Sequence, residues 1–403
     1  ASANLTKNLA VRIKTSGSAA AVATVDGKEY STVSAALAAA SDGATISVVS
    51  DVTTGSISID KSVTIDLGGY TVTSNSRPFV ISNDGVEFNL KNGAVVANGG
   101  GNWGVVLSAN AGKVVLTDCE ITAQEGAIGL LAGTTGNTIE INGGVYTGLD
   151  NAVISGNGSA RDGEPNNIIV NGGTFNGKIQ TSGYVACGIY APWKDIITIN
   201  GGEFNIENGV GVLCRGGQVY INGGTFTTTD PNGELGKVGD SRVVVPCKTL
   251  FVDKYSNYSD YENAQIIVSG GKFSDDACKD YLADGYGMIK DVDWYKVVKA
   301  TVATDEASLK GANTAGSAIL VNQSIVLTDK NLSMEDGTSL YVAKDVVLSS
   351  EFTGSYFMTL SYMNKSGVIS GEGTIVAPEK KNSFTAAIVF DSTNKELVID
   401  GNL

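Results

Sequence analysis

Hydrophobic and polar residues alternate along most of the chain in short runs, and these runs commonly end at Gly or Asn. In one such run, Ile139 and Ile141 flank Glu140, which places the two apolar side chains on the same face of a strand. Helical spacing is confined to a few short segments. The pattern therefore predicts an all-β protein built from many short strands separated by Gly/Asn turns.

One phrase recurs along the chain, and we call it the marker phrase: apolar-x-apolar-Asn-Gly-Gly-x-aromatic. Its copies occupy residues 139–146, 168–175, 197–204, 219–226 and, with Ser269 in place of Asn, 266–273. The first glycines lie at positions 143, 172, 201, 223 and 270, so the steps are 29, 29, 22 and 47 residues. Weaker copies precede them at 90–93 and 116–119. Self-similarity of this kind indicates a repeat architecture.

A second recurring strand lies between the marker phrases, at 103–107, 127–131, 152–154, 187–190, 210–214 and 249–252. At about 3.3 Å per residue, a period of this length suffices for one closed triangular coil of two or three strands. Stacked coils pair each strand in parallel with its equivalent in the next coil. We expect the aromatic residues of the marker phrases to stack in the core, the Gly pairs to supply positive φ at a corner, and the asparagines to form an amide ladder. The ladder residues are Asn142, Asn171, Asn200 and Asn222.

The marker phrases resemble the Gly-Gly-Thr-Phe coils of right-handed parallel β-helix proteins in the pectate-lyase-like superfamily. Such repeats are abundant in surface proteins of gut Firmicutes and in their phages. The resemblance covers residues 45–280 well and 314–403 loosely. It implies a right-handed parallel β-helix, and it says little about function, because the repeat is a packing motif.

Two segments with helical spacing divide the chain. Residues 31–40 follow an expected Ser31 N-cap and predict a helix that covers the first coil. Residues 304–312 repeat this pattern before strands at 318–321 and 324–327, which indicates a second start. We therefore expect an N-terminal arm (1–24), a parallel β-helix with its cap helix (25–300) and a smaller β-helix-like domain (301–403). Residues 281–299 are expected to finish the first unit.

Charge and composition narrow the function classes. Lys and Arg number 28 against 42 Asp and Glu, a net charge of −14, which disfavours nucleic-acid and anionic-membrane partners. No apolar run is long enough to cross a membrane. Histidine is absent, which removes the commonest general base and metal ligand. The five cysteines are widely spaced without a CxxC pair, so we expect buried thiols, in a chain maturing under reducing or anaerobic conditions, and neither a metal site nor a cofactor.

The N-terminal arm has little core character and carries Lys7, Arg12 and Lys14. Such a terminus is usually flexible. Alternatively, it docks into an acidic partner surface or a neighbouring copy of the chain, and we favour this interpretation. The first residues lack the features of a signal peptide, so either such a peptide has been removed or only an initiator Met has.

Aromatic residues suggest a carbohydrate surface. Trp103, Tyr184, Tyr190 and Trp193 form a candidate strip, and Tyr255, Tyr258 and Tyr261 crowd one loop. Aromatic rings on β-helix faces stack on sugars, but they are also common in loop packing. The 47-residue step contains a Gly-rich, charged loop at 230–242, and protruding loops of this kind often carry binding function.

The enzyme hypothesis finds weaker support. Polygalacturonases, which the fold resembles, use an Asn-Thr-Asp, an Asp-Asp, a Gly-His-Gly and an Arg-Ile-Lys. Here Arg-Ile-Lys lies in the arm at 12–14, Asp-Asp is present at 275–276, and the other motifs are missing. Pectate lyases use calcium held by carboxylates and a basic proton acceptor. The nearest candidates, which we interpret as a solvated rim, are Asp150, Arg161, Asp162, Glu164, Asp195 and Arg215.

Together these features predict a non-enzymatic, surface-displayed structural or attachment protein on a virion or cell surface. One setting is a phage virion decoration, fibre or tail-spike-like protein whose arm contacts other virion proteins. The alternatives are a secreted bacterial adhesin that binds host glycans, and a polysaccharide lyase or hydrolase.

Overall fold

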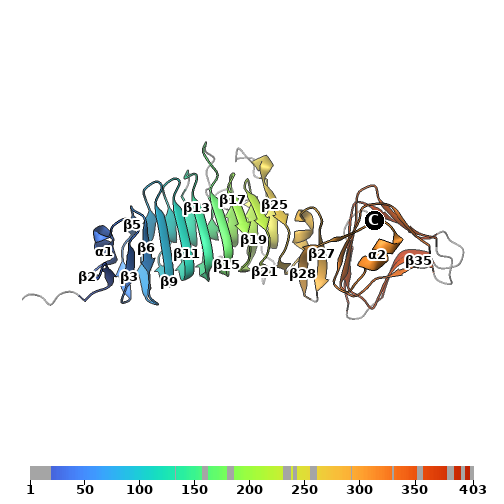
Figure 1. The fold of residues 1–403 in the computed structure, drawn as a ribbon, viewed down its shortest axis with the longest axis horizontal. Helices are drawn as coiled ribbons and strands as arrows, with labels where there is room; N and C mark the ends of the chain where they lie inside the picture. Colours follow the sequence, from blue (N-terminus) through green and yellow to red (C-terminus); the bar gives the residue numbers. More distant parts are fainter. Residues whose placement is uncertain are drawn as a thin grey trace, which may run out of the picture.

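The chain forms a parallel β-solenoid followed by a second, smaller parallel unit (Figure 1). The predicted all-β parallel β-helix fold is confirmed. The structure, a computed structural model, describes residues 20–131, 133–156, 162–178, 186–229, 237–238, 243–254, 261–291, 293–328, 331–351, 357–378, 385–391 and 395–399.

Two sheets build most of the first unit. The longer one, here called the long sheet, contains β1 (Ala23–Val25), β2 (Lys28–Tyr30), β3 (Thr45–Val48), β4 (Val52–Thr54), β6 (Val63–Asp66), β7 (Thr71–Ser74), β9 (Glu87–Ala97), β11 (Lys113–Ala123), β13 (Thr138–Gly148), β15 (Asn167–Lys178), β17 (Ile196–Ile199), β18 (Glu203–Glu207), β20 (Gln218–Ile221), β21 (Thr225–Thr229), β25 (Gln265–Val268), β26 (Lys272–Phe273), β27 (Tyr286–Asp291) and β28 (Trp294–Lys299). The eight-stranded sheet contains β5 (Ile57–Ile59), β8 (Phe79–Ile81), β10 (Trp103–Leu107), β12 (Gly126–Leu130), β14 (Ala152–Ser155), β16 (Ala186–Ala191), β19 (Gly209–Cys214) and β24 (Lys248–Val252).

Successive coils pair in parallel and in register. Leu116 of β11, for example, aligns with Leu90 of β9 on one side and with Ile141 of β13 on the other, and all three are fully buried. The predicted strands were short, but β9, β11, β13 and β15 run for 11, 11, 11 and 12 residues. They are longer because coil-to-coil backbone pairing continues through the corner at which each strand bends.

The aromatic residues of the marker phrases stack inside the coils, as predicted. Tyr146, Phe175, Phe204, Phe226 and Phe273 are all fully buried. Adjacent ring centroids lie 5.2, 4.6, 4.7 and 5.0 Å apart, and the ring planes differ by 12, 13, 5 and 6°. This column follows directly from the register, because each of these residues pairs with its equivalent in the next coil.

A helix covers the first coil, as predicted, although it starts one residue later than expected. Helix α1 (Val33–Ala39) is capped by the Thr32 hydroxyl, which accepts a hydrogen bond from the Ala35 backbone N–H, so Ser31 is not the N-cap. Its buried face contributes Val33, Ala36 and Leu37 to the core. The core itself begins at Ala23 in β1, two residues before the domain boundary that we predicted.

An antiparallel hairpin closes the other end of the first unit. The 3-10 helix η3 (Asp276–Tyr281) leads into β27 and β28, which pair antiparallel with each other. β28 also pairs antiparallel with β26, which ends the parallel stack. Tyr295 and Val297 of β28 belong to the same core as the aromatic column. The hairpin therefore ends the parallel stack of the first unit.

The second unit has three parallel sheets around its own core. The five-stranded sheet contains β29 (Thr301–Ala303), β30 (Ala318–Val321), β33 (Thr338–Val342), β36 (Gly367–Gly371) and β39 (Leu397–Ile399); the others contain β31 (Ile325–Leu327), β34 (Val347–Ser350) and β37 (Thr374–Ile375), and β32 (Leu332–Ser333), β35 (Phe357–Met363) and β38 (Thr385–Asp391). Helix α2 (Glu306–Ala312) matches the predicted second cap. Its N-terminus has a capping box between Asp305 and Ser308, and it buries Leu309 and Ala312.

Other described elements are few. β22 (Lys237–Val238) and β23 (Val243–Val244) pair antiparallel within the long insertion, and η2 (Tyr261–Asn263) precedes β25. Four of the five cysteines are buried and Cys247 is half-buried, as expected for small core thiols. No helix in the described ranges is long and apolar enough to cross a membrane.

Candidate functional site

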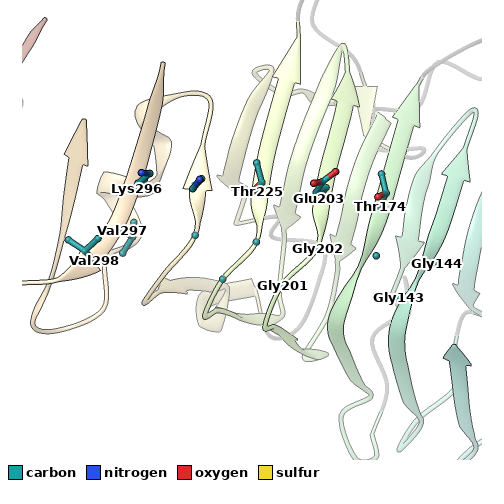
Figure 2. A pocket seen from close by; sticks show the side chains of 15 residues that line it. Gly143, Gly144, Thr174, Gly201, Gly202, Glu203, Thr225, Lys296, Val297 and Val298 are labelled. Atoms are coloured by element: carbon teal, nitrogen blue, oxygen red, sulfur yellow. The ribbon is translucent and has the colours of Figure 1, made fainter. Parts of the chain in front are cut away.

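A long hollow follows the corner at which the Gly pairs turn the strands. We call it the glycine-corner groove; its volume is about 770 Å³ and it spans the coils from Gly143 to Val298 (Figure 2). The second glycine of each pair has positive φ, for example 96° at Gly144 and 104° at Gly224. A Cβ atom on Gly144 would lie 2.2 Å from the Cys119 carbonyl oxygen, so only glycine fits this bend. The groove exists because no side chain fills the corner.

One wall of the groove is a column of side chains from neighbouring strands. Strand pairing aligns Thr174, Glu203, Thr225, Lys272 and Lys296 in that order. Figure 2 shows Thr174, Glu203, Thr225 and Lys296 as a row across the strands. Neighbouring strands are about 4.8 Å apart. The wall therefore carries one acidic side chain, Glu203, and a pair of neighbouring lysines, Lys272 and Lys296, that begins two coils further on.

A smaller hollow continues the corner toward the N-terminal coils. It has a volume of about 290 Å³ and shares Gly144 with the larger groove. Asp118 and Glu120 line it, and both are exposed. Asp118 has a positive φ of 49°, as Asn92 on the preceding coil does at 60°, so in these coils the positive φ lies one position earlier than the second glycine of the Gly pairs. Taken together, the two hollows have acidic residues at the N-terminal end and lysines at the C-terminal end.

The predicted asparagine ladder lies beside the groove and holds its coils in register. Each side-chain amide donates to the amide oxygen of the preceding coil: Asn171 to Asn142 at 2.7 Å, Asn200 to Asn171 at 2.9 Å and Asn222 to Asn200 at 2.9 Å. Ser269 occupies the position of the fifth marker phrase at which the other four have Asn. Its hydroxyl donates to the side-chain oxygen of Asn222 at 2.9 Å. The ladder is therefore confirmed and is one coil longer than the asparagines alone.

The groove geometry suits binding better than acid–base chemistry. Among the described residues that line it, the only carboxylate is Glu203, and a full coil, that of Thr225, separates it from Lys272. Acid–base catalysis needs its groups within hydrogen-bond reach of one reacting atom. A long, rigid groove with threonines and charges on its wall can instead hold an extended chain.

The described aromatic candidates do not form an exposed strip. Trp103 is half-buried on β10, where its ring covers Gly126 and Gly129 of the next coil. Tyr190 is half-buried on β16 beside Arg215, and Tyr261 starts η2. Trp193 is fully buried, so its proposed role in stacking on sugars is wrong. Tyr184, Tyr255 and Tyr258, and the arm residues Lys7, Arg12 and Lys14, lie outside the described residues.

Trp193 is buried because the chain turns sharply at this residue. Its φ is +27°, and a Cβ atom on Gly216 would lie 2.9 Å from the Trp193 backbone nitrogen. The close backbone contact with Gly216 brings the indole into the protein. The Lys194 ammonium lies 4.6 Å from the ring centroid, a cation–π distance.

The interpretation of the acidic and basic residues as a solvated rim is wrong for three of them. Asp150, Asp195 and Arg215 are exposed by 5, 0 and 1%. Asp195 accepts a hydrogen bond from the Asn166 amide at 2.9 Å. Asp162 and Glu164 are exposed, as expected, and Arg161 lies outside the described residues.

Arg215 belongs to a separate cluster. Its Nε and Nη2 atoms donate to one carboxylate oxygen of Asp253, at 2.9 and 2.6 Å. Burial alone lowers the pKa of Arg215, but its hydrogen bonds with Tyr190 and Asp253 and the electrostatic attraction of these two groups outweigh burial, so the pKa is raised and the charge is retained. Asp195 is part of a buried ladder instead, so Arg215 and Asp195 are both held by structural contacts.

A second, buried ladder was missed in the sequence. Asn137 donates to Asn166 at 3.1 Å, Asn166 donates to Asp195 at 2.9 Å, and all three residues are fully buried. Each of them lies six positions before the first glycine of a marker phrase. This constant offset, with its 29-residue step, was the signal that could have revealed the ladder.

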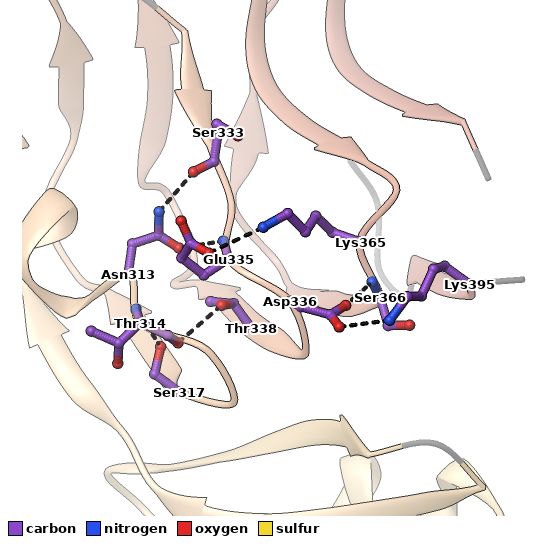
Figure 3. Close-up of polar contacts among 10 residues, drawn as sticks. All are labelled: Asn313, Thr314, Ser317, Ser333, Glu335, Asp336, Thr338, Lys365, Ser366 and Lys395. Carbon is purple, nitrogen blue, oxygen red and sulfur yellow. Dashed lines mark hydrogen bonds and ion pairs between the residues drawn. The ribbon is translucent and has the colours of Figure 1, made fainter.

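The second unit has a polar corner of its own (Figure 3). The Lys365 ammonium lies 3.1 Å from Glu335, and the Lys395 ammonium lies 2.6 Å from Asp336. The hydrogen bond from Lys395 and one from the Ser366 backbone N–H at 2.8 Å lower the pKa of Asp336. These groups link three successive coils, so we interpret this corner as structural.

No group of three or more metal-ligating side chains occurs in the part of the chain that the structure describes. Comparisons with family models, with curated proteins and with solved structures found no match to the chain.

Proposed function

We propose that the chain is a non-enzymatic, surface-displayed structural protein that projects as a rigid rod and attaches through its N-terminal arm. The setting that we favour is a phage virion, as a head decoration, fibre or tail-spike-like protein. One observation carries the proposal: the buried aromatic column and the asparagine ladder run without interruption through the coils of the marker phrases.

These two columns favour a stiff projecting element. The eight strands of the eight-stranded sheet belong to eight successive coils, and at a spacing of about 4.8 Å the first and last of them are about 34 Å apart. A bend at any coil would separate stacked rings and break amide hydrogen bonds at the same level. Helix α1 and the β27–β28 hairpin cover the two ends, so the rod does not depend on the arm for its core.

The attachment role can be tested by removing residues 1–19, which leaves β1 and its core residue Ala23 in place. We expect thermal melting of the coils to change little, and assembly of the chain into its particle or oligomer to fail. A Lys7→Ala/Arg12→Ala/Lys14→Ala variant separates charge from length, because it keeps the complete arm. Normal assembly of the truncated chain would overturn the proposed docking role.

A second candidate is an adhesin that binds glycans, and the glycine-corner groove favours it. The groove is long, open and lined by threonines and charged side chains, which suits an extended polymer. Thr174→Trp would fill the groove, whereas Thr122→Trp would place the same bulk further along the strands, at a position outside the groove lining. Loss of glycan binding in the first variant alone would favour the adhesin.

The enzyme alternative, a polysaccharide lyase or hydrolase, makes a different prediction. Under our proposal, incubation with polygalacturonate or alginate in the presence of calcium releases neither unsaturated nor reducing ends. Activity that disappears in Asp162→Ala would reverse the proposal in favour of an enzyme.

A further inference from the structure

A cavity lies where the first unit meets the second. Its volume is about 310 Å³, and it is lined on one side by the segment between η3 and β27, and on the other by Leu320 of β30 and Tyr341 of β33. It is separate from the glycine-corner groove, with which it shares no lining residue. Cavities of this size at the junction of two units commonly hold a small ligand.

The close contact between the units explains the cavity. β27 lies against the outer face of the five-stranded sheet, and a Cβ atom on Gly287 would come within 2.8 Å of the Ala318 Cβ. Val368, on the same face as Ala318, joins the core of the first unit. Next to this contact, Leu320 and Tyr341 lie in register on neighbouring strands. The half-buried Tyr286 lines the cavity from the first unit.

The charges around the cavity are mainly acidic. Asp280 and Asp284 line it, and both are exposed. The one lysine in the lining, Lys279, forms an ion pair with Asp276 at 2.8 Å, which offsets its charge. Tyrosine rings attract cations through their electron-rich faces, and carboxylates at the rim add a Coulombic contribution.

We propose that this cavity binds an organic ammonium group, of the size of choline or of one amino sugar. Two tyrosines and two leucines supply an apolar and aromatic wall, and the Asp284 carboxylate supplies the countercharge. A bare metal ion is disfavoured, because the described residues contain no group of three metal-ligating side chains. This proposal does not depend on the proposed attachment role.

The test is a titration of the full chain by isothermal calorimetry or ligand-observed NMR. Choline is compared with 3,3-dimethylbutan-1-ol, which has the same shape without the charge, and glucosamine with N-acetylglucosamine. We expect each cation to bind at least about tenfold more tightly than its neutral partner, since cation–π contacts and carboxylates act on charge. Preference for choline or glucosamine distinguishes a quaternary from a primary ammonium ligand.

Variants locate the site. Tyr341→Leu keeps an apolar wall and should weaken binding about tenfold, as should Asp284→Asn. Tyr70→Leu, at a residue 39% exposed on the first coils, and Asp60→Asn are matched controls and should bind as the unmodified chain does. Equal binding of charged and neutral compounds, no binding of either cation, or unchanged affinity in the cavity variants would each overturn the proposal. Thermal melting verifies that every variant is folded.

Discussion

Phe204 and Phe226 lie in register on adjacent strands, with ring centroids 4.7 Å apart and ring planes inclined by only 5°. Phe204 has another such neighbour, Phe175, at 4.6 Å on the preceding coil. Each interior ring of the column therefore packs against rings on both sides. The column is a continuous part of the core, so truncation of one ring removes contacts in three coils.

We expect Phe204→Ala to lower the free energy of unfolding by about 3–5 kcal/mol, because it leaves a cavity that the fixed coil spacing cannot close. Urea unfolding followed by circular dichroism measures the loss. Val145→Ala, at a residue 40% exposed, is the control and should change stability by less than about 0.5 kcal/mol. A Phe204→Ala protein as stable as the unmodified chain would show that the column contributes little.

The two ladders should differ in their energetic contributions. Asn171 is exposed and Asn166 is fully buried, although each makes side-chain hydrogen bonds to both neighbouring coils. Asn171→Ala should cost about 1 kcal/mol, whereas Asn166→Ala should cost about 2–4 kcal/mol because its partners remain buried without their hydrogen bonds. The same urea experiment compares them, and equal losses would contradict this account.

Cysteine labelling should be selective in the folded protein. Burial raises the pKa of Cys119, Cys187 and Cys214 to about 12, and raises that of Cys278 well above its usual range. At pH 8 a thiol with a pKa of 12 is ionised in about one molecule in ten thousand. We expect iodoacetamide to modify the half-buried Cys247 first, as mass spectrometry can show.

Two controls define that experiment. Cys247→Ser should abolish the fast labelling, and all five cysteines should react in denaturant. Labelling of Cys187 as fast as that of Cys247 would mean that the eight-stranded sheet opens readily.

Glu306 predicts how the second unit responds to acid. A hydrogen bond from Lys310, with further ones from Thr328, lowers the pKa of Glu306 from 4.5 to about 2. The unfolded chain thus binds the proton more tightly than the folded one. The stabilisation is complete above about pH 4.5 and is lost as the pH falls toward 2.

Glu306→Gln should therefore remove part of the pH dependence of unfolding between about pH 4.5 and 2. Glu372→Gln is a suitable control, because Glu372 is 70% exposed and lies 3.9 Å from Lys344. Urea midpoints across this pH range measure the effect. Identical pH profiles for Glu306→Gln and the unmodified chain would show that α2 does not contribute through this carboxylate.

The fold of the first unit was largely predictable because the bend at its corner leaves a recurring Gly pair in the sequence. A bend that excludes Cβ atoms requires glycine, as at Gly144, and the parallel register repeats this requirement in each coil that carries a marker phrase. The aromatic column and the exposed ladder follow from the same register. In the second unit, the core column Ile319, Leu340 and Ile369 has steps of 21 and 29 residues without a marker phrase, so only its helix and first strands could be placed.

The candidate site was harder to predict because burial depends on contacts between distant segments. We predicted that Trp193 stacks on sugars because it has a large aromatic ring, but the chain packs closely against Gly216 at this residue and the indole is buried. Asp195 resembled a rim carboxylate, yet its spacing from Asn166 places it in the interior. The glycine-corner groove was implied by the marker phrases, but the sequence pattern shows only that a corner bends, and says nothing about the hollow left beside it.

The exposed asparagine ladder has a direction. Asn171, Asn200 and Asn222 each donate to the preceding, N-terminal coil, and the first amide of the ladder, Asn142, donates within its own strand to the Glu140 carboxylate at 3.0 Å. The amides are therefore aligned dipoles with an anion at their positive end, and no single amide can rotate without opposing its neighbours. The ladder therefore ends in a donor at its N-terminal side and in an acceptor at its C-terminal side, so the two ends of the solenoid differ chemically along this edge.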